Sequence, residues 1–131
     1  MKKSTPIIFL IFLSTSCAWL DECQSEVIIG DYYIGWCDLE ENRSVNKLRE
    51  ESNTNSKTIL QSYVFEVGNN EDYIIAKQRS YNGESIKYFI IEIQNNDNVI
   101  GPLSLNEFKE KSKVLKISNL IFRLKYSEIL N

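Results

Sequence analysis

The sequence predicts a mainly β protein of the α+β class: an antiparallel β-meander sheet with one C-terminal α-helix packed on it. Short apolar segments alternate with Asn- and Gly-rich turns at intervals of about ten to fifteen residues, which is typical of an antiparallel meander. A helix-start signature follows the last of these turns, near residue 104. The chain has 131 residues, of which 43% are hydrophobic, so we expect one domain with a core of its own.

Residues 1–16 have the three parts of a secretory signal peptide. Residues 1–3 include two lysines, residues 7–13 are all apolar, and the small residues 14–16 follow them. Seven apolar residues span only about 10 Å as a helix, which is too short to cross a bilayer. We therefore expect this segment to direct export and then to be removed.

Residues 13–17 resemble the lipobox of bacterial lipoproteins, in which small residues precede a lipidated cysteine. The usual Leu stands three positions before that cysteine, whereas Leu13 stands four positions before Cys17. We expect Cys17 to carry lipid, palmitate included, so that residues 17–25 form a lipid-anchored leader at a membrane of the cell envelope. Ala18 replaces the Asp that retains such lipoproteins in the inner membrane, which implies the outer membrane. Ordinary signal cleavage after Ala18 is the alternative.

The other two cysteines, Cys23 and Cys37, are expected to form a disulfide. Export permits the bond, and the two lack the C-x-x-C spacing of reactive thiols. Closing a loop of about 15 residues contributes roughly 3 kcal/mol in the chain-entropy account. A two-residue turn at residues 30–31 would place Cys23 opposite Asp38, so we expect a bulge or an irregular strand end near the bridge.

Residues 26–131 are expected to form the β-rich domain. The expected strands are 27–29, 32–37, 44–49, 63–67, 73–77, 86–93, 99–100 and 120–126. The polar run 50–57 has no apolar residue and is expected to be a loop. Alternation in the strand at 63–67 places Tyr63, Phe65 and Val67 on one face.

A helix is expected from residue 105 to about Lys113. Ser104 and Glu107 have the spacing of a capping box, in which each side chain bonds the backbone N–H of the other residue. Gly101 and Pro102 are expected to end the preceding strand. The residues expected to face the sheet are Leu105, Phe108 and either Ser112 or Leu115.

The absence of histidine removes several classes of active site. Ser-His-Asp and Cys-His nucleophile sites, histidine proton shuttles and nearly all zinc and copper sites need this residue. Loss of Lys2 and Lys3 with the signal leaves 13 basic and 18 acidic side chains, a net charge of −5. This balance argues against nucleic acid as a partner, because phosphate binding needs clustered Lys and Arg.

The carboxylates do not form an evident catalytic pair. Residues 40–41, residues 71–72 and Asp97 lie in expected turns, where carboxylates are solvated, whereas a glycosidase needs a facing pair with one raised pKa. No D-x-D-x-D-G calcium loop and no glycine-rich phosphate loop occur. We expect no catalytic, cofactor or metal site, and no enzymatic activity.

Aromatic side chains are numerous enough to line a sugar- or peptide-binding face, although core packing explains them equally well. They are Tyr32, Tyr33, Trp36, Tyr63, Tyr73, Tyr81 and Tyr88.

Several segments are similar to those of a known group of proteins. They are DYYIGWCD at 31–38, NRS at 42–44, DYIIAKQ at 72–78, YFII at 88–91 and GPLS at 101–104, ahead of a Lys- and Glu-rich helix. Together they resemble small uncharacterised lipoproteins of Gram-negative bacteria that carry a domain of unknown function. The resemblance covers most of residues 31–116. It implies an envelope location and the fold, and it brings no activity.

Three functions are consistent with these observations. We expect an exported, lipid-anchored envelope protein that recognises another envelope protein without catalysis; an immunity protein of a toxin pair is one form of this. The second hypothesis is a module that binds a small ligand or glycan, and the third is a carboxylate-dependent hydrolase. An exposed apolar patch would favour a protein partner. A concave site with aromatic walls would favour a small ligand or glycan. A buried carboxylate pair would favour the hydrolase.

Overall fold

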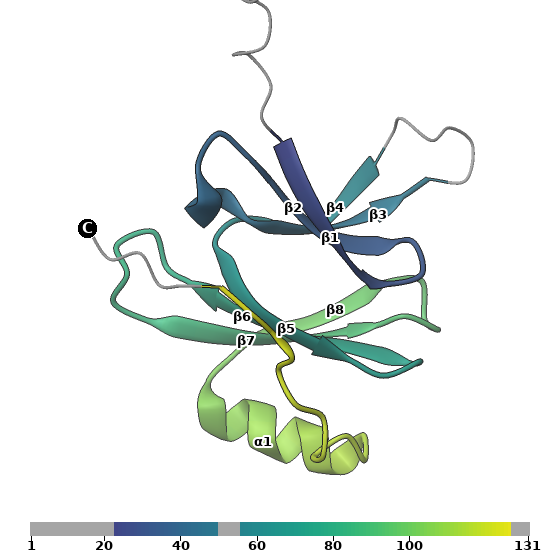
Figure 1. The fold of residues 1–131 in the computed structure, drawn as a ribbon. Coiled ribbons are helices and arrows are strands. Elements are labelled where there is room, and N and C mark those ends of the chain that lie inside the picture. The colour runs from purple at the N-terminus through teal and green to yellow at the C-terminus, as the bar shows by residue number, and fades with distance from the viewer. Residues whose placement is uncertain (1–22, 50–55, 127–131) are drawn as a thin grey trace, which may run out of the picture.

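The protein has three layers, two β-sheets and one helix, in a computed structural model that describes residues 23–49 and 56–126 (Figure 1). The first sheet contains β1 (Cys23–Ile29), β2 (Tyr32–Cys37), β3 (Ser44–Leu48) and β4 (Ser56–Leu60), with a 3-10 turn η1 (Glu40–Asn42) before β3. The second contains β5 (Val64–Asn69), β6 (Tyr73–Arg79), β7 (Ile86–Glu92), β8 (Asn98–Leu103) and β9 (Leu124–Lys125). Helix α1 (Leu105–Val114) covers the side of the second sheet that faces away from the first.

Every strand pair is antiparallel, and both sheets are meanders. Strands β1 to β4 pair in chain order, and so do β5 to β8, while β9 returns to pair with β5 at the edge of the second sheet. The predicted class is therefore confirmed, and the meander is divided between two facing sheets. No helix among the described residues is long and apolar enough to span a membrane.

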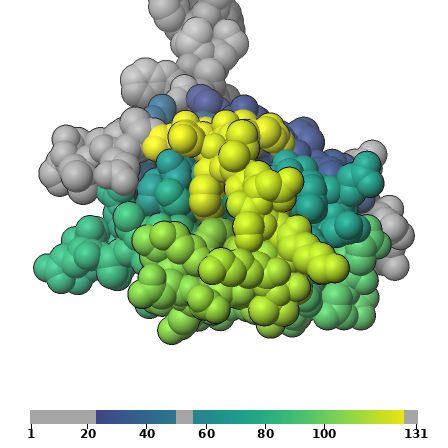
Figure 2. Space-filling view, turned by 90° about the horizontal axis from the view of Figure 1, so that it is seen from below, coloured from purple at the N-terminus to yellow at the C-terminus, as the bar shows by residue number. Residues whose placement is uncertain are grey.

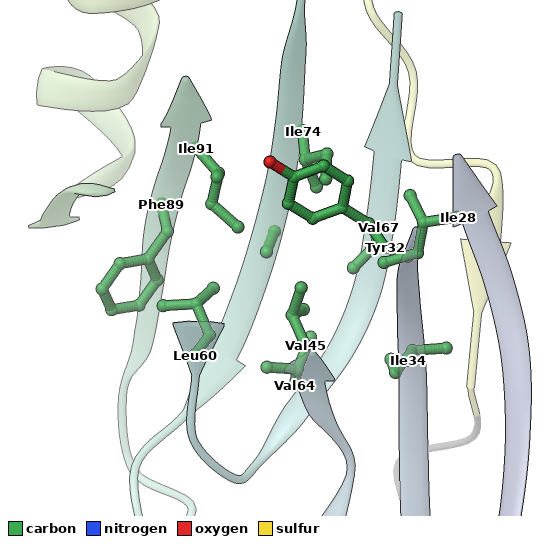
Figure 3. Close-up of a cluster of buried hydrophobic side chains, with 11 residues drawn as sticks. Ile28, Tyr32, Ile34, Val45, Leu60, Val64, Val67, Ile74, Phe89 and Ile91 are labelled. Atoms are coloured by element: carbon green, nitrogen blue, oxygen red, sulfur yellow. The ribbon is translucent and has the colours of Figure 1, made fainter. Parts of the chain in front are cut away.

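The main core lies between the two sheets, whose apolar side chains point toward one another (Figure 3). It consists of Ile28, Tyr32, Ile34, Val45, Leu60, Val64, Val67, Ile74, Ala76, Phe89 and Ile91. Fully burying an aliphatic or aromatic side chain of this size contributes roughly 1.5–3 kcal/mol. This core holds the two sheets face to face.

A second core lies between the second sheet and α1. Its buried members are Ile75, Ile90 and Ile117, and partly buried apolar side chains, Phe108 among them, pack against these three. The capping box forms as predicted: Glu107 N–H donates to Ser104 Oγ at 3.2 Å, and Ser104 N–H donates to Glu107 Oε2 at 3.4 Å. The prediction for Leu105 was wrong, because this side chain is half exposed beside an open groove between helix and sheet.

Some strand boundaries differ from the prediction because pairing partners, not local composition, decide them. Residues 56–57, expected to be loop, are strand because β4 pairs with β3, where Lys57 lies opposite Lys47; residues 50–55 lie outside the described residues. Strand β8 continues through Gly101 and Pro102 to Leu103 instead of ending before them, because Leu103 still pairs with β7.

Two β-bulges decide which side chains face the core. In β1, Ile29 pairs with Tyr32 and Val27 pairs with Tyr33, so that Ile28 is the extra residue. This shift brings Cys23 opposite Cys37; the predicted bulge exists, but it lies beside the turn and not beside the bridge. In β5, the register shifts between Val64 and Glu66, which breaks the predicted alternation, and Val64 joins Val67 in the main core.

The segment after α1 runs from the helix toward β1 (Figure 2). Only Leu124–Lys125 pairs as a strand, whereas the prediction extended over 120–126. The shorter strand follows from packing: Leu120 and Phe122 contact the helix-side core, and Leu124 contacts the main core. Gly68 permits this path, because a Cβ there would lie 2.0 Å from the carbonyl oxygen of Ile121.

Candidate recognition site

The outer face of the first sheet is the face that none of the described elements covers. Both faces of the second sheet are packed, one against the first sheet and the other against α1 (Figure 1). Strand register places Ser25, Gly35 and Ser44 in one cross-strand row of the outer face, and Val27, Tyr33 and Asn46 in the next. The Cys23–Cys37 disulfide lies beside the first row.

This face contains a hollow of about 600 Å³, which we call the outer groove. Its lining is Cys23, Gln24, Ser25, Val27, Gly30, Asp31, Tyr33, Gly35, Trp36, Cys37, Asn42, Ser44, Asn46, Leu48 and Ser56. Among these described residues, Asp31 alone carries a charge. The short side chains in the row of Ser25, Gly35 and Ser44 leave space on this face.

One edge of the Tyr33 ring lies against the floor of the outer groove. A Cβ on Gly35 would lie 3.1 Å from Tyr33 Cε2 and 3.4 Å from Tyr33 Cδ2, so this edge of the ring is close to the Gly35 backbone. Tyr33 also lines the groove, so its ring adjoins the space that a ligand would occupy. A larger residue at position 35 would lift the ring from this position.

Asn46 is held by hydrogen bonds on both sides within the outer groove. Its Nδ2 donates to Ser44 Oγ at 3.0 Å, and its Oδ1 accepts from Thr58 Oγ1 at 3.0 Å. The three side chains come from the neighbouring strands β3 and β4. Nδ2 also donates to the Ser44 carbonyl oxygen at 3.2 Å, and 7% of Asn46 is exposed. The amide is therefore fixed in one orientation, with its hydrogens bonded within the protein, and it positions the Ser44 hydroxyl.

Most of the aromatic residues considered in the sequence do not line one face. The rings of Tyr88 and Phe108 stack under α1 at 5.0 Å between centroids, and Tyr63 pairs with Tyr81. Tyr32 is part of the main core. Of these rings, only that of Tyr33 lies in the outer groove, because Trp36, although it borders the groove, packs its ring on Tyr126. Strand register separates the rings, so core packing, and not one shared binding face, accounts for most of them.

Arg43 forms a buried contact between the sheets that the sequence did not reveal. Its guanidinium lies 5.0 Å from the ring centroid of Trp36 and 4.2 Å from that of Tyr126, and 4% of the residue is exposed. Burial lowers the pKa of Arg43, although Glu40 at 3.6 Å acts in the opposite direction. Burial and a hydrogen bond to Glu26 raise the pKa of Tyr126. These contacts join the first sheet to the C-terminal segment.

Asp97 forms a second contact between the sheets. It lies in the turn before β8, and its carboxylate accepts hydrogen bonds from Tyr32 and Lys47 and pairs with Lys57 at 3.8 Å. Turn carboxylates were expected to be solvated, but the side chain of Asp97 is only 10% exposed, because the first sheet lies over the turn.

The charge of Asp97 is stabilised. Burial alone would raise the pKa of Asp97, but the hydrogen bonds from Tyr32 and Lys47 outweigh it, and this pKa lies below its ordinary value. A general acid needs the opposite shift. We call Asp97, Tyr32, Lys47 and Lys57 the Asp97 cluster, and we assign it a structural role.

The structure joins Cys23 and Cys37 in a disulfide at the edge of the outer groove. Cys17 and the expected signal peptide at 1–16 lie outside the described residues, as does most of the leader at 17–25. In the ranges 23–49 and 56–126, no group of three Cys, Asp or Glu side chains is placed to hold a metal ion.

Comparison with known proteins gives a family. The family model of DUF3997, a protein of unknown function, matches residues 29–128. The chain belongs to the DUF3997 family. The matched range starts at the end of β1 and includes all the later strands and α1, so it covers nearly the whole described fold. No curated protein and no solved structure matches the chain.

Proposed function

We propose that this DUF3997 protein is an exported, lipid-anchored protein of the cell envelope that binds a ligand in the outer groove without catalysing a reaction. Export and anchoring are supported by the signal-like residues 1–16 and by the lipobox-like segment ending at Cys17. The Cys23–Cys37 disulfide suits an oxidising compartment outside the cytosol.

The observation that carries the binding proposal is the concave outer face of the first sheet. Concave sites with an aromatic wall and a few fixed polar groups are typical of ligand binding. The outer groove has Tyr33 as its aromatic wall and, as a fixed polar group, the Ser44 hydroxyl that Asn46 holds in place. The exposed apolar residues on this face are few, mainly Val27 and Leu48, so it is less suited to a flat protein interface. A ligand is therefore favoured over a protein partner of the immunity type.

The anchor is tested by metabolic labelling with a clickable palmitate analogue. We expect label on the wild-type protein and none on Cys17→Ser. An unlabelled wild-type protein would show that the envelope anchor is wrong, and ordinary cleavage after Ala18 would take its place.

The binding face is tested by site-specific photo-cross-linking in living cells. The photoreactive residue replaces Val27 in the outer groove or, as the matched control, Val114 on α1; these valines are 64% and 71% exposed. We expect an adduct from position 27 and none from position 114. Adducts from position 114 alone, or from neither position, would contradict recognition through the outer groove.

A further inference from the structure

We propose that the outer groove binds an uncharged saccharide chain, with one sugar ring stacked on Tyr33 and the hydroxyl groups of the sugar bonded to the side chains around Asn46. This inference rests on the proposed function and specifies the chemistry of its ligand.

The lining of the outer groove favours a neutral ligand. Asp31 is its only charged residue within the described ranges, and it lies at the turn between β1 and β2. A charged ligand buried here would lose hydration without gaining a partner of opposite charge over most of the surface, which is costly. Phosphate-rich polymers and strongly charged peptides are therefore poor occupants.

Tyr33 provides the flat apolar surface that a sugar ring needs. One face of a pyranose presents C–H groups, and the face of an aromatic ring carries partial negative charge that attracts them. The Cδ2–Cε2 edge of the Tyr33 ring lies close to Gly35, which restricts the ring at the place where it lines the groove. Little side-chain freedom is lost when a ligand packs on a ring held in this way.

The polar side chains of the outer groove suit hydroxyl-rich ligands. Sugar hydroxyls both donate and accept hydrogen bonds, and so do the hydroxyls of Ser25 and Ser44. Ser44 Oγ accepts from Asn46 and still has its own hydrogen to donate. The orientation of Asn46 is set by Ser44 and Thr58, so these groups are arranged before binding.

The size of the outer groove fits a short chain. Its volume of about 600 Å³ falls within the roughly 300–1,000 Å³ of small-molecule sites. The outer groove runs across the strands from the disulfide toward Leu48 and Ser56. Several sugar units can lie one after another along this path.

The test uses the full mature protein in detergent on an array of neutral and anionic oligosaccharides, followed by titration of the best-bound one. We expect binding to neutral chains, about tenfold weaker binding by Tyr33→Ala, and wild-type binding by Tyr33→Phe, which keeps the platform. The matched control is Tyr81→Ala, which removes a tyrosine that is 90% exposed on the turn between β6 and β7. Ser25→Asp, at an exposed site in the groove, tests charge exclusion without loss of packing and should abolish binding.

Preference for anionic chains, or equal losses from Tyr33→Ala and Tyr81→Ala, would overturn the inference. An array without binding, together with a protein adduct from photoreactive position 27, would overturn the saccharide and leave the outer groove as a recognition face. No binding and no adduct would overturn both.

Discussion

The two sheets differ in how many of their faces are packed. In the second sheet, β6 has three consecutive buried residues at 74–76 and β7 has three at 89–91, because one face meets the first sheet and the other meets α1. In the first sheet, inward Ile34 and Val45 are fully buried, while Gly35 and Ser44 lie on the outer face. A sheet packed on both faces is a scaffold, and a sheet packed on one face can offer the other to a ligand.

In addition to the main core, polar contacts at its borders hold the first sheet on the second. Asp97 reaches β2, β3 and β4 from the turn before β8. Arg123 donates to the carbonyl oxygen of Ile28 at 2.7 Å and to Asn69 Oδ1 at 3.0 Å, which connects β1 with β5. The outer groove therefore lies on a sheet whose inner face packs on the main core and whose edges are held by Asp97 and Arg123.

The largest expected difference between the sheets comes from truncating one apolar side chain in each. Ile90→Ala removes a fully buried side chain between the second sheet and α1 and should lower the free energy of unfolding by about 4 kcal/mol. Leu48→Ala removes a side chain that is 39% exposed in the outer groove and should cost less than about 1 kcal/mol. Urea denaturation measures both, and equal costs would show that the outer face is covered in solution.

A second test changes one glycine in the second sheet and, as its control, one in the turn between β1 and β2. Gly68→Ala should lower the free energy of unfolding by about 3 kcal/mol, because its Cβ would lie 2.0 Å from the backbone oxygen of Ile121. Gly30→Ala is the matched control: no atom lies within 4 Å of its Cβ, and only its φ of +56° costs energy, about 1 kcal/mol. Thermal unfolding compares the two variants. A Gly68→Ala protein as stable as Gly30→Ala would contradict the close approach of the C-terminal segment.

The Asp97 cluster tests the connection between the sheets. Asp97→Asn should lower the free energy of unfolding by about 2 kcal/mol near pH 7, since it removes a charge that Tyr32, Lys47 and Lys57 surround. This loss of unfolding free energy is smaller than for a fully buried ion pair, because Lys47 and Lys57 both keep contact with water.

The same variant has a defined pH dependence. The folded pKa of Asp97 lies below the ordinary 3.8, so its stabilisation is complete above that value and is lost as the pH falls through the folded pKa. Urea denaturation from pH 7 to pH 2.5 should therefore show the wild-type protein and Asp97→Asn converging in acid. A constant difference over this range would contradict the lowered pKa.

The smallest expected effect concerns the helix side of the second sheet. Ser112 lies buried on α1, and its Oγ has no hydrogen-bond partner among the described residues. Ser112→Ala removes this unpaired hydroxyl, so the free energy of unfolding should stay equal or rise by up to about 1 kcal/mol. Ser44→Ala in the outer groove is the control, since it removes the acceptor of the Asn46 bond and should not stabilise. A loss of stability from Ser112→Ala would show that the hydroxyl is paired in solution.

Short-range patterns identified most of the local structure. The turns at 30–31 and 82–83, the capping box from Ser104 to Glu107 and the apolar strands β6 and β7 depend on residues within a few positions of one another. Strand β4 was not predicted, because its apolar content is low and its position depends on pairing with β3. The bulge at Ile28 could be inferred, because only a shifted register lets Cys23 meet Cys37.

The sequence by itself determined the mainly β class, the hairpins, the start of the helix and the two cysteines available for pairing, because each of these is encoded by neighbours along the chain. Only the tertiary structure decided that the meander divides into two facing sheets, that Asp97 is enclosed and that Tyr33 lines the outer groove. These features depend on contacts between distant residues: Tyr32 and Asp97 are 65 positions apart, and Ile28 and Arg123 are 95 apart. Burial and partnership are properties of the packed chain, so local composition does not specify them.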